Sequence, residues 1–158
     1  MKNLTHFDIK GNTQMVDVSQ KKETVRIAEA KGLVLMKKET LSKILEEKIN
    51  KGNVLNTAQL AGIMATKQTS NLIPLCHSIN ISSVNLDLIP DKKNSCININ
   101  SKVICLGNTG VEMEALMAVS TSALTIYDMC KSIDRGIIIK EIKLISKSGG
   151  KSGTWSND

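Results

Sequence analysis

Residues 111–131, VEMEALMAVSTSALTIYDMCK, decide how this 158-residue chain is organised. The stretch predicts a long helix with acids at its start (Glu112, Glu114) and an acid–base pair at its end (Asp128, Lys131). An α-helix rises about 1.5 Å per residue, so Glu112 and Asp128 would lie roughly 24 Å apart. One small-molecule pocket cannot readily use both ends of a straight helix. An antiparallel second copy would bring the two ends together, which predicts a site shared between subunits.

Sequence periodicity predicts the elements around this helix. Alternating apolar residues predict strands at 25–36, 79–88, 97–105 and 137–147. Spacings of three and four residues predict helices at 40–49 and 54–67. Asn53 is the expected N-cap of the second of these helices. The alternation changes phase at Ser82 and Ser83, which predicts a β-bulge there.

The order of these elements, β-α-α-β-β-α-β, predicts an α+β, ferredoxin-like fold. We expect an antiparallel sheet with helices packed on one face. Neither an internal repeat nor an inter-domain linker is evident, so residues 1–158 are expected to form a single domain. The polar residues 1–20 and the tail at 148–158 are expected to be flexible.

The composition favours a phosphate-bearing small molecule as the partner. Aromatic residues are only 2% of the chain, and Phe7, Tyr127 and Trp155 all lie outside the predicted strands. Nucleic-acid-binding domains that stack bases on exposed aromatic side chains need more than these. The net charge of +6 suggests an anionic partner, and the cations are scattered among Gly, Asn and Ser turns. A generically basic, soluble surface is the alternative interpretation.

The cysteines indicate a reducing compartment. Cys76, Cys96, Cys105 and Cys130 show no paired spacing, and only His6 and His77 could join them in a zinc site. Free thiols are therefore expected, which suggests the cytoplasm. The sequence has neither an apolar stretch long enough to span a bilayer nor a signal core at its start.

Several polar residues could carry chemistry, and each has a structural alternative. Lys51 precedes a helix start, which attracts anions, although a solvated loop lysine is the simpler interpretation. His77 follows Pro74 and could bind phosphate or move protons, but a lone histidine is more often structural. Asp128 and Lys131 are spaced i, i+3, so they are either a surface ion pair or an acid–base couple.

Other candidates have stronger structural alternatives. Thr109 and Glu112 fit a capping box, and Glu112 and Glu114 lie about 200° apart round a helix, so they should not share one face. Lys67 suits a helix C-terminus, and Cys76 lacks a positioned base, which favours a core position. The tail is not a P-loop, because Ile145 stands where the motif needs its first glycine.

Four runs together carry a resemblance to a known family: MVDVSQKKETVRIAEAKG (15–32), LAGIMATKQTSNLIPLCH (60–77), GNTGVEMEALMAVSTSALTIYDMCK (107–131) and KSGGKSG (147–153). From about Phe7 onward the chain resembles the molybdenum cofactor biosynthesis protein C family, the cyclic pyranopterin monophosphate synthases. The resemblance implies a ferredoxin-like, homohexameric lyase, assembled as a trimer of dimers with interface active sites. Its substrate would be (8S)-3',8-cyclo-7,8-dihydroguanosine 5'-triphosphate from a radical GTP cyclase, and its products cyclic pyranopterin monophosphate and pyrophosphate.

The resemblance also implies roles for individual residues. The catalytic set would be Lys51, His77, Asp128 and Lys131. The substrate-binding set would be Leu75, Cys76, His77, Met113 and Glu114, supported by Glu112, with Arg26, Lys67 and Lys147 as cations for the triphosphate and Asp17 on a segment that orders over it. No protein-held metal or other cofactor is implied, although Mg²⁺ could accompany the triphosphate.

The chain departs from the family pattern at a few positions. Asn108 stands where the family often has a basic residue, and Asn53, Gln68 and Asn71 replace residues that are often charged. These changes affect local salt bridges and phosphate affinity. The alternative function is a non-catalytic purine nucleotide or pterin binder on the same scaffold, and a basic RNA-binding domain ranks last.

Overall fold

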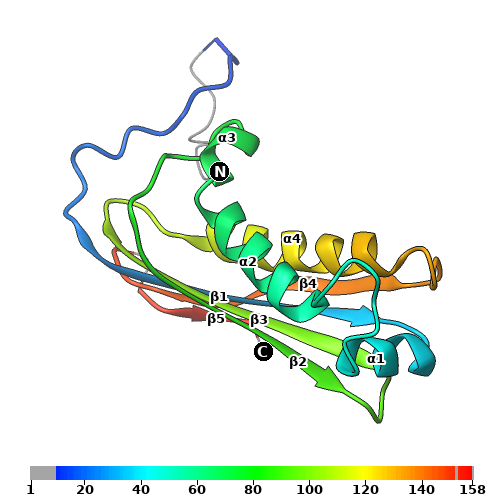
Figure 1. The fold of residues 1–158 in the computed structure, drawn as a ribbon. Helices are drawn as coiled ribbons and strands as arrows, with labels where there is room; N and C mark the ends of the chain where they lie inside the picture. Colours follow the sequence, from blue (N-terminus) through cyan, green and yellow to red (C-terminus); the bar gives the residue numbers. More distant parts are fainter. Residues whose placement is uncertain (1–9, 152, 158) are drawn as a thin grey trace.

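An antiparallel sheet with helices on one face forms the described part of the chain (Figure 1). The structure is a computed structural model that describes residues 10–151 and 153–157. In chain order the elements are β1 (Thr24–Leu35), α1 (Lys38–Leu45), α2 (Val54–Thr66), α3 (Thr69–Leu72), β2 (Ile81–Asp91), β3 (Cys96–Gly107), α4 (Glu112–Cys130), β4 (Ile138–Ser148) and β5 (Trp155–Ser156). Phe7, His6 and residues 1–9 generally lie outside the described residues.

The strand order is β2-β3-β1-β4-β5, with every neighbouring pair antiparallel. The first four strands have the ferredoxin-like order, with β1 between β3 and β4, so the predicted α+β fold is confirmed. The predicted bulge is also confirmed, because the register of β2 on β3 shifts between Ile81 and Ser83. α2 and α4 lie side by side on one face of this sheet (Figure 1).

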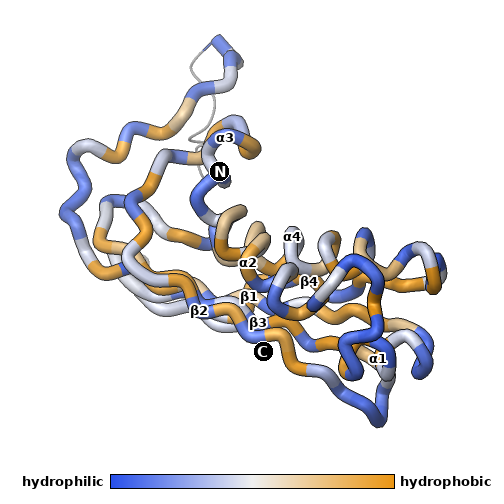
Figure 2. The backbone as a smooth tube through the Cα atoms, viewed as in Figure 1, coloured by the Kyte–Doolittle hydropathy of each residue, from blue (hydrophilic) through white to orange (hydrophobic). Residues whose placement is uncertain are grey.

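The core lies between α2, α4 and the sheet, and it is built of small and branched side chains. Ala28, Ala30 and Val34 face it from β1, and Ile97 and Ile99 face it from β3, all 2% exposed or less. Figure 2 shows hydrophobic residues along the strands beneath α2 and α4, and hydrophilic ones in the connections round α1. Because none of the buried side chains in this cluster is aromatic, with Tyr127 only partly buried against it, the two layers can approach closely.

α2 and α4 approach each other closely at Gly62. Near it, Ser122 Oγ donates a hydrogen bond to the Ala58 carbonyl oxygen at 2.9 Å. A Cβ at position 62 would collide with the side chains of Ser122 and Leu86 and lie 2.7 Å from the Ala118 carbonyl oxygen. We therefore expect Gly62→Ala to lower the free energy of unfolding by about 1–3 kcal/mol through overpacking. Urea denaturation followed by circular dichroism measures this loss.

Gly107→Ala is the matched control for this prediction. A Cβ at Gly107 would meet Cys105 Sγ at 3.6 Å, which is ordinary van der Waals contact. Its effect on stability should be much smaller than that of Gly62→Ala. Equal losses for the two variants would show that the helix contact at Gly62 is not what limits the packing.

The helix ends match the predictions in part. Asn53 caps α2 as predicted, with its side chain accepting from Asn56 N at 2.9 Å. The predicted capping box is wrong: α4 begins at Glu112 after Val111, and no side chain caps it. The first short helix ends at Leu45 rather than at 49, because Glu47 adopts a left-handed φ of 55°.

The tail contains a strand that the sequence did not predict. Trp155 lies in β5, where it pairs with Lys147 of β4, so its predicted position outside the strands is wrong. Two residues are too short for an alternation signal, which is why the pattern did not reveal this strand. The flexibility of residues 1–20 and 148–158 stays a prediction.

Candidate functional site

The predicted site residues gather at the two ends of α4. At its start, a cavity of about 440 Å³ is lined by residues of three chain segments. We call it the Glu112 pocket, and its lining residues are Val16, Val18, Lys21, Leu75, Cys76, His77, Ile79, Thr109, Gly110, Glu112 and Met113. The loop before β2, the residues before α4 and the segment before β1 therefore share one hollow.

His77 joins two of these segments. Its Nε2 lies 2.7 Å from the Val16 carbonyl oxygen, which holds the segment before β1 against the loop before β2. Asp17 does not line the pocket, but its neighbours Val16 and Val18 do. Hydrogen bonds from Ser19 lower the pKa of the Asp17 carboxyl, and the charge of His77 lowers it further. The structure thus places Asp17 beside the pocket, on the segment that crosses it.

The two acids at the start of α4 have different surroundings. Glu112 Oε1 accepts a hydrogen bond from Lys147 Nζ at 2.7 Å, at the rim of the pocket. Glu114 is only 2% exposed, and burial raises the pKa of its carboxyl. Among the described residues its Oε2 has no hydrogen-bond partner. The prediction that the two acids do not share one face is therefore consistent with their burial.

Cys76 lies between core and pocket. Its side chain is half-buried and lines the Glu112 pocket, so the core position predicted from its spacing is only partly right. Burial raises the pKa of the Cys76 thiol, and the charges of Glu114 and Glu112 raise it further. A thiol held protonated is a poor nucleophile, so Cys76 can contact a ligand but is not suited to attack one.

Cations surround a second cavity that adjoins the Glu112 pocket. This cavity of about 170 Å³ is lined by Lys21, Arg26 and Lys147, among others, and it shares Glu112 with the pocket. The Arg26 guanidinium donates to the carbonyl oxygens of Gly107 and Asn108, at 3.2 and 3.3 Å.

Lys21 was not among the predicted residues, although it lines both cavities. It belongs to the run Lys21-Lys22, where spacing carries no signal for a site. A further cavity of about 590 Å³ is lined by both of these lysines, with Arg26 and Lys151. This end of the molecule therefore presents a cationic surface suited to a polyphosphate.

Lys67 lies apart from the other cations. It is the C-cap of α2 and lines a cavity of about 530 Å³ with Ile79 and Ser82. That cavity shares only Ile79 with the Glu112 pocket. A cation is electrostatically favourable at a helix C-terminus, so stability alone accounts for its position within one chain.

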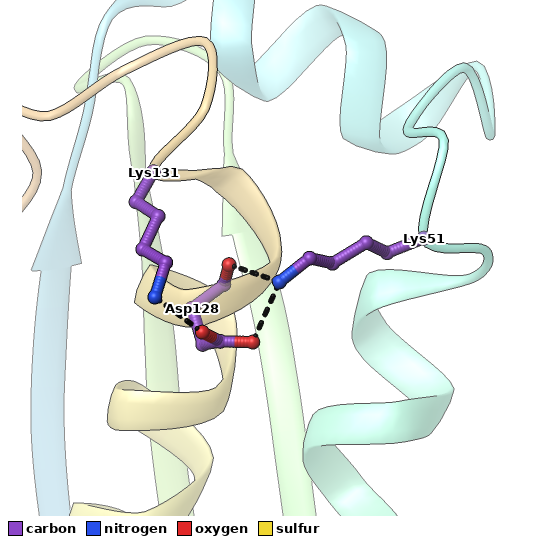
Figure 3. A network of polar contacts seen from close by, with 3 residues as sticks. All are labelled: Lys51, Asp128 and Lys131. Carbon is purple, nitrogen blue, oxygen red and sulfur yellow. Dashed lines mark hydrogen bonds and ion pairs between the residues drawn. The ribbon is translucent and has the colours of Figure 1, made fainter.

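At the far end of α4, three side chains form the Asp128 cluster (Figure 3). Lys51 Nζ donates to Asp128 Oδ2 at 2.8 Å and to the Asp128 carbonyl oxygen at 2.9 Å. Lys131 Nζ lies 2.7 Å from Asp128 Oδ1. The three side chains are each about half exposed, at 48% to 55%. Lys51 and Lys131 thus flank one carboxylate that remains open to solvent.

Both lysines shift the titration of this carboxylate. The hydrogen bond from Lys131, followed by that from Lys51, lowers the pKa of Asp128 from 3.8 to about 2. In return, the carboxylate raises the pKa of Lys131. Near neutral pH the Asp128 carboxylate is therefore ionised, and the Lys131 ammonium group holds its proton more tightly than a free lysine does.

Acid should remove the stabilisation that this cluster gives. Because the Asp128 pKa is lowered, the contribution is fully present above pH 3.8 and is lost as the pH falls through about 2. We expect the unfolding free energies of wild type and Asp128→Asn to converge over that interval, as measured by urea denaturation. In about 1 M salt the difference should shrink at every pH. If the unfolding free energies of wild type and Asp128→Asn still differ near pH 2, the stabilisation does not come from the ionised Asp128 carboxylate.

The Glu112 pocket and the Asp128 cluster do not meet within one chain. Helix α4 has 19 residues, with Glu112 in its first turn and Asp128 in its last, and at about 1.5 Å per residue its length separates the Glu112 pocket from the Asp128 cluster. Of the predicted catalytic residues, Lys51, Asp128 and Lys131 come together and His77 does not join them. This separation is the one that the spacing of Glu112 and Asp128 predicts.

Comparison with known proteins identifies the family. The profile of the MoaC family matches residues 15–150, which include both ends of α4. The chain belongs to the MoaC family. Proteins named cyclic pyranopterin monophosphate synthase are 52% identical over 158 residues in Magnetococcus marinus and 54% identical over 156 residues in Thermoanaerobacter pseudethanolicus. These alignments cover 100% and 99% of this chain, and 97% and 99% of the relatives.

A third relative of the same name, from Heliobacterium modesticaldum, is 53% identical over 152 residues, covering 96% of each chain. The resemblance stated from the four sequence runs is thus confirmed at the level of the MoaC family. Within the described residues, no three His, Cys, Asp or Glu side chains gather in a way that could hold a metal ion. None of the described helices is long and apolar enough to cross a membrane, and the four cysteines are free.

Proposed function

We propose that this chain is a lyase of molybdenum cofactor biosynthesis that converts (8S)-3',8-cyclo-7,8-dihydroguanosine 5'-triphosphate to cyclic pyranopterin monophosphate and pyrophosphate. Its membership of the MoaC family and the names of its relatives carry this conclusion. The cation-lined hollow beside the Glu112 pocket suits a triphosphate, and the Glu112 carboxylate at the start of α4 suits the N–H groups of a guanine-derived ring.

We propose further that two subunits complete each active site. The Glu112 pocket of one chain would face the Asp128 cluster of another, because a single chain keeps them at opposite ends of α4. Large apolar side chains on the helix layer are available for such a contact: Leu60 and Met64 of α2 and Leu124 of α4 are 58% to 60% exposed. Apolar surface of this kind favours burial against a second copy. A homohexamer, assembled as a trimer of dimers, is the proposed state.

The residue chemistry matches the steps of the reaction. Ring opening and closure need proton transfers, for which the Asp128 carboxylate and the Lys131 ammonium form an acid–base couple. Closing the cyclic phosphate expels pyrophosphate, and Lys51, Lys131 and Lys147 would stabilise its developing charge. Glu112 would accept hydrogen bonds from the ring N–H and amino groups once substrate displaces Lys147.

A single-turnover assay tests the function. The purified protein is mixed with the cyclised dihydro-GTP substrate, and mass spectrometry follows pyrophosphate and the pyranopterin. Both products should form together, in amounts equal to the number of active sites in the sample. Tight binding of substrate or of a GTP analogue without either product would instead support the alternative, a non-catalytic purine nucleotide or pterin binder.

The compartment, the source of the substrate and the divalent ion are also part of the proposal. We place the reaction in the cytoplasm, directly after a radical GTP cyclase that supplies the substrate. Mg²⁺ would arrive bound to the triphosphate rather than to a protein site. An assay with the divalent ion chelated measures whether turnover depends on it.

A further inference from the structure

A buried carboxylate, Asp134, links the two chain segments that carry the Asp128 cluster. We propose that Asp134 is a positioning residue of that cluster: it fixes α1, and through α1 Lys51, against the last turn of α4. The inference rests on the proposed function only for its activity readout, because the geometry that it concerns can be measured without turnover.

Asp134 is attached to α4 on one side. Its own N–H donates to the Cys130 carbonyl oxygen at 3.0 Å, so it belongs to the turn that closes the helix just after Lys131. Its Oδ1 accepts from Gly136 N at 3.1 Å, which fixes the orientation of the carboxylate. The side chain is only 2% exposed, although it carries a charge. Such a group is stable in the interior only when fully hydrogen-bonded.

On the other side the same carboxylate holds the start of α1. Asp134 Oδ2 accepts from Lys37 N at 2.9 Å and from Thr40 Oγ1 at 3.0 Å, although the chain separates these residues by more than 90 positions. The N-cap residue Lys37 makes no side-chain cap of its own. Asp134 therefore acts as the cap of α1 from a distance, and a negative charge at a helix start is favourable.

Lys51 is carried by the connection that follows α1. Residues 46–48 hydrogen-bond back to carbonyl oxygens in the last turns of α1, and Asn53 donates a side-chain hydrogen bond to Glu47 at 2.8 Å. Ile49 is buried in the core, and Gly52 N bonds back to its carbonyl oxygen. Gly52 itself has a φ of 98°, a conformation that glycine adopts at little cost. A shift of α1 would thus move Lys51 with it.

The lysines of the cluster differ in their dependence on this link. Lys131 and Asp128 belong to the same helix end, three residues apart, so their ion pair needs no help from α1. Lys51 reaches Asp128 from a segment 77 residues away in sequence. Among the described residues, the hydrogen bonds that join these two segments are those of Asp134 and those of Lys51. Loss of Asp134 should therefore loosen Lys51 and leave Lys131 in place.

Competitive acylation of lysines, read by peptide mass spectrometry, tests this selectivity in the full-length protein. An ammonium group held by a carboxylate is acylated slowly. The Asp128→Ala variant removes that carboxylate, so it gives the upper limit of the acylation rate for both Lys51 and Lys131. In Asp134→Asn, one carbonyl oxygen cannot replace both carboxylate oxygens. We expect Lys51 to react about two- to fivefold faster, the range that an exposed ion pair allows, and Lys131 to react at its wild-type rate. Lys43 of α1 serves as the internal standard.

Thr40→Val is the second variant, because it keeps Asp134 and removes one of its bonds to α1. We expect the acylation rate of Lys51 to rise by less than in Asp134→Asn, and the rate of Lys131 to stay unchanged. Thr66→Val is its matched control: Thr66 is equally buried, but its hydroxyl bonds within its own helix, to Ile63. An unchanged Lys51 rate in folded Asp134→Asn, or an equal rise at Lys51 and Lys131, would overturn the proposal.

Turnover supplies an independent readout. If Lys51 acts in the proposed reaction, Asp134→Asn should lower kcat by about 10- to 100-fold and leave KM nearly unchanged, because misplaced catalytic groups affect the chemical step. Should the wild type form no product at all, the proposed function fails, and the acylation result still decides the role of Asp134. A higher KM with an unchanged kcat in Asp134→Asn would overturn the positioning role.

Discussion

Asp128→Ala is expected to reduce single-turnover product formation by about 10²–10⁴-fold, the usual contribution of a positioned acid–base group. The carboxylate is the only group that contacts both Lys51 and Lys131 in the described structure. Its removal leaves two ammonium groups at one place with no counter-charge. The measurement is the rate of pyrophosphate release from the cyclised dihydro-GTP substrate.

The fold should survive this change. Asp128 is 55% exposed, and solvent-exposed ion pairs contribute little to stability. Sedimentation of wild type and variant should therefore agree. Lys48→Ala is the matched control, since it breaks another exposed ion pair, with Glu46 at 2.7 Å, on the same connection as Lys51. Near-normal turnover of Asp128→Ala, or a comparable loss in Lys48→Ala, would exclude a specific role for Asp128.

Subunit mixing should recover activity from two inactive variants. Asp128→Ala removes the cluster at one end of α4, and His77→Ala removes a lining residue of the pocket at the other end. In a mixed dimer with shared sites, one site receives both defects and the other receives neither. In a mixed hexamer whose subunits pair at random, about a quarter of the sites are intact, so about a quarter of wild-type activity should return. Co-expression with two affinity tags and purification on both yields the mixed oligomer for assay.

The control for mixing pairs two variants of the same cluster. Asp128→Ala mixed with Lys131→Ala leaves no intact site in any arrangement, because both side chains belong to one end of α4. Activity should then stay at the level of the single variants. If the Asp128→Ala and His77→Ala mixture also stays inactive while forming the oligomer, each site lies within one chain.

The sequence could predict what depends on neighbours along the chain. The N-cap Asn53, the bulge at Ser83 and the ion pair of Asp128 with Lys131 all follow from residues a few positions apart. Local spacing carries those signals because helix turns and strand alternation repeat over two to four residues. The ferredoxin-like order followed from the same alternation, summed over the whole chain.

Contacts between distant segments could not be predicted in this way. The ion pair of Glu112 with Lys147 joins α4 to β4, and it leaves Glu112 engaged with Lys147, where a capping box was expected. His77 meets Val16 across 61 residues, and no spacing rule relates them. The resemblance to the family named Glu112, Lys147 and His77, but the partners that these residues contact were visible only once the chain was folded.

The aromatic-poor composition leaves the molecule with a built-in optical reporter. Trp155 is the single tryptophan of the chain, and β5 places it beside Lys147, whose ammonium group holds Glu112. Fluorescence excited in the indole band therefore arises at the end of the molecule where Lys147 and Arg26 line a cavity. Emission changes during a titration would follow events at that end in wild-type protein, without a label or a further substitution.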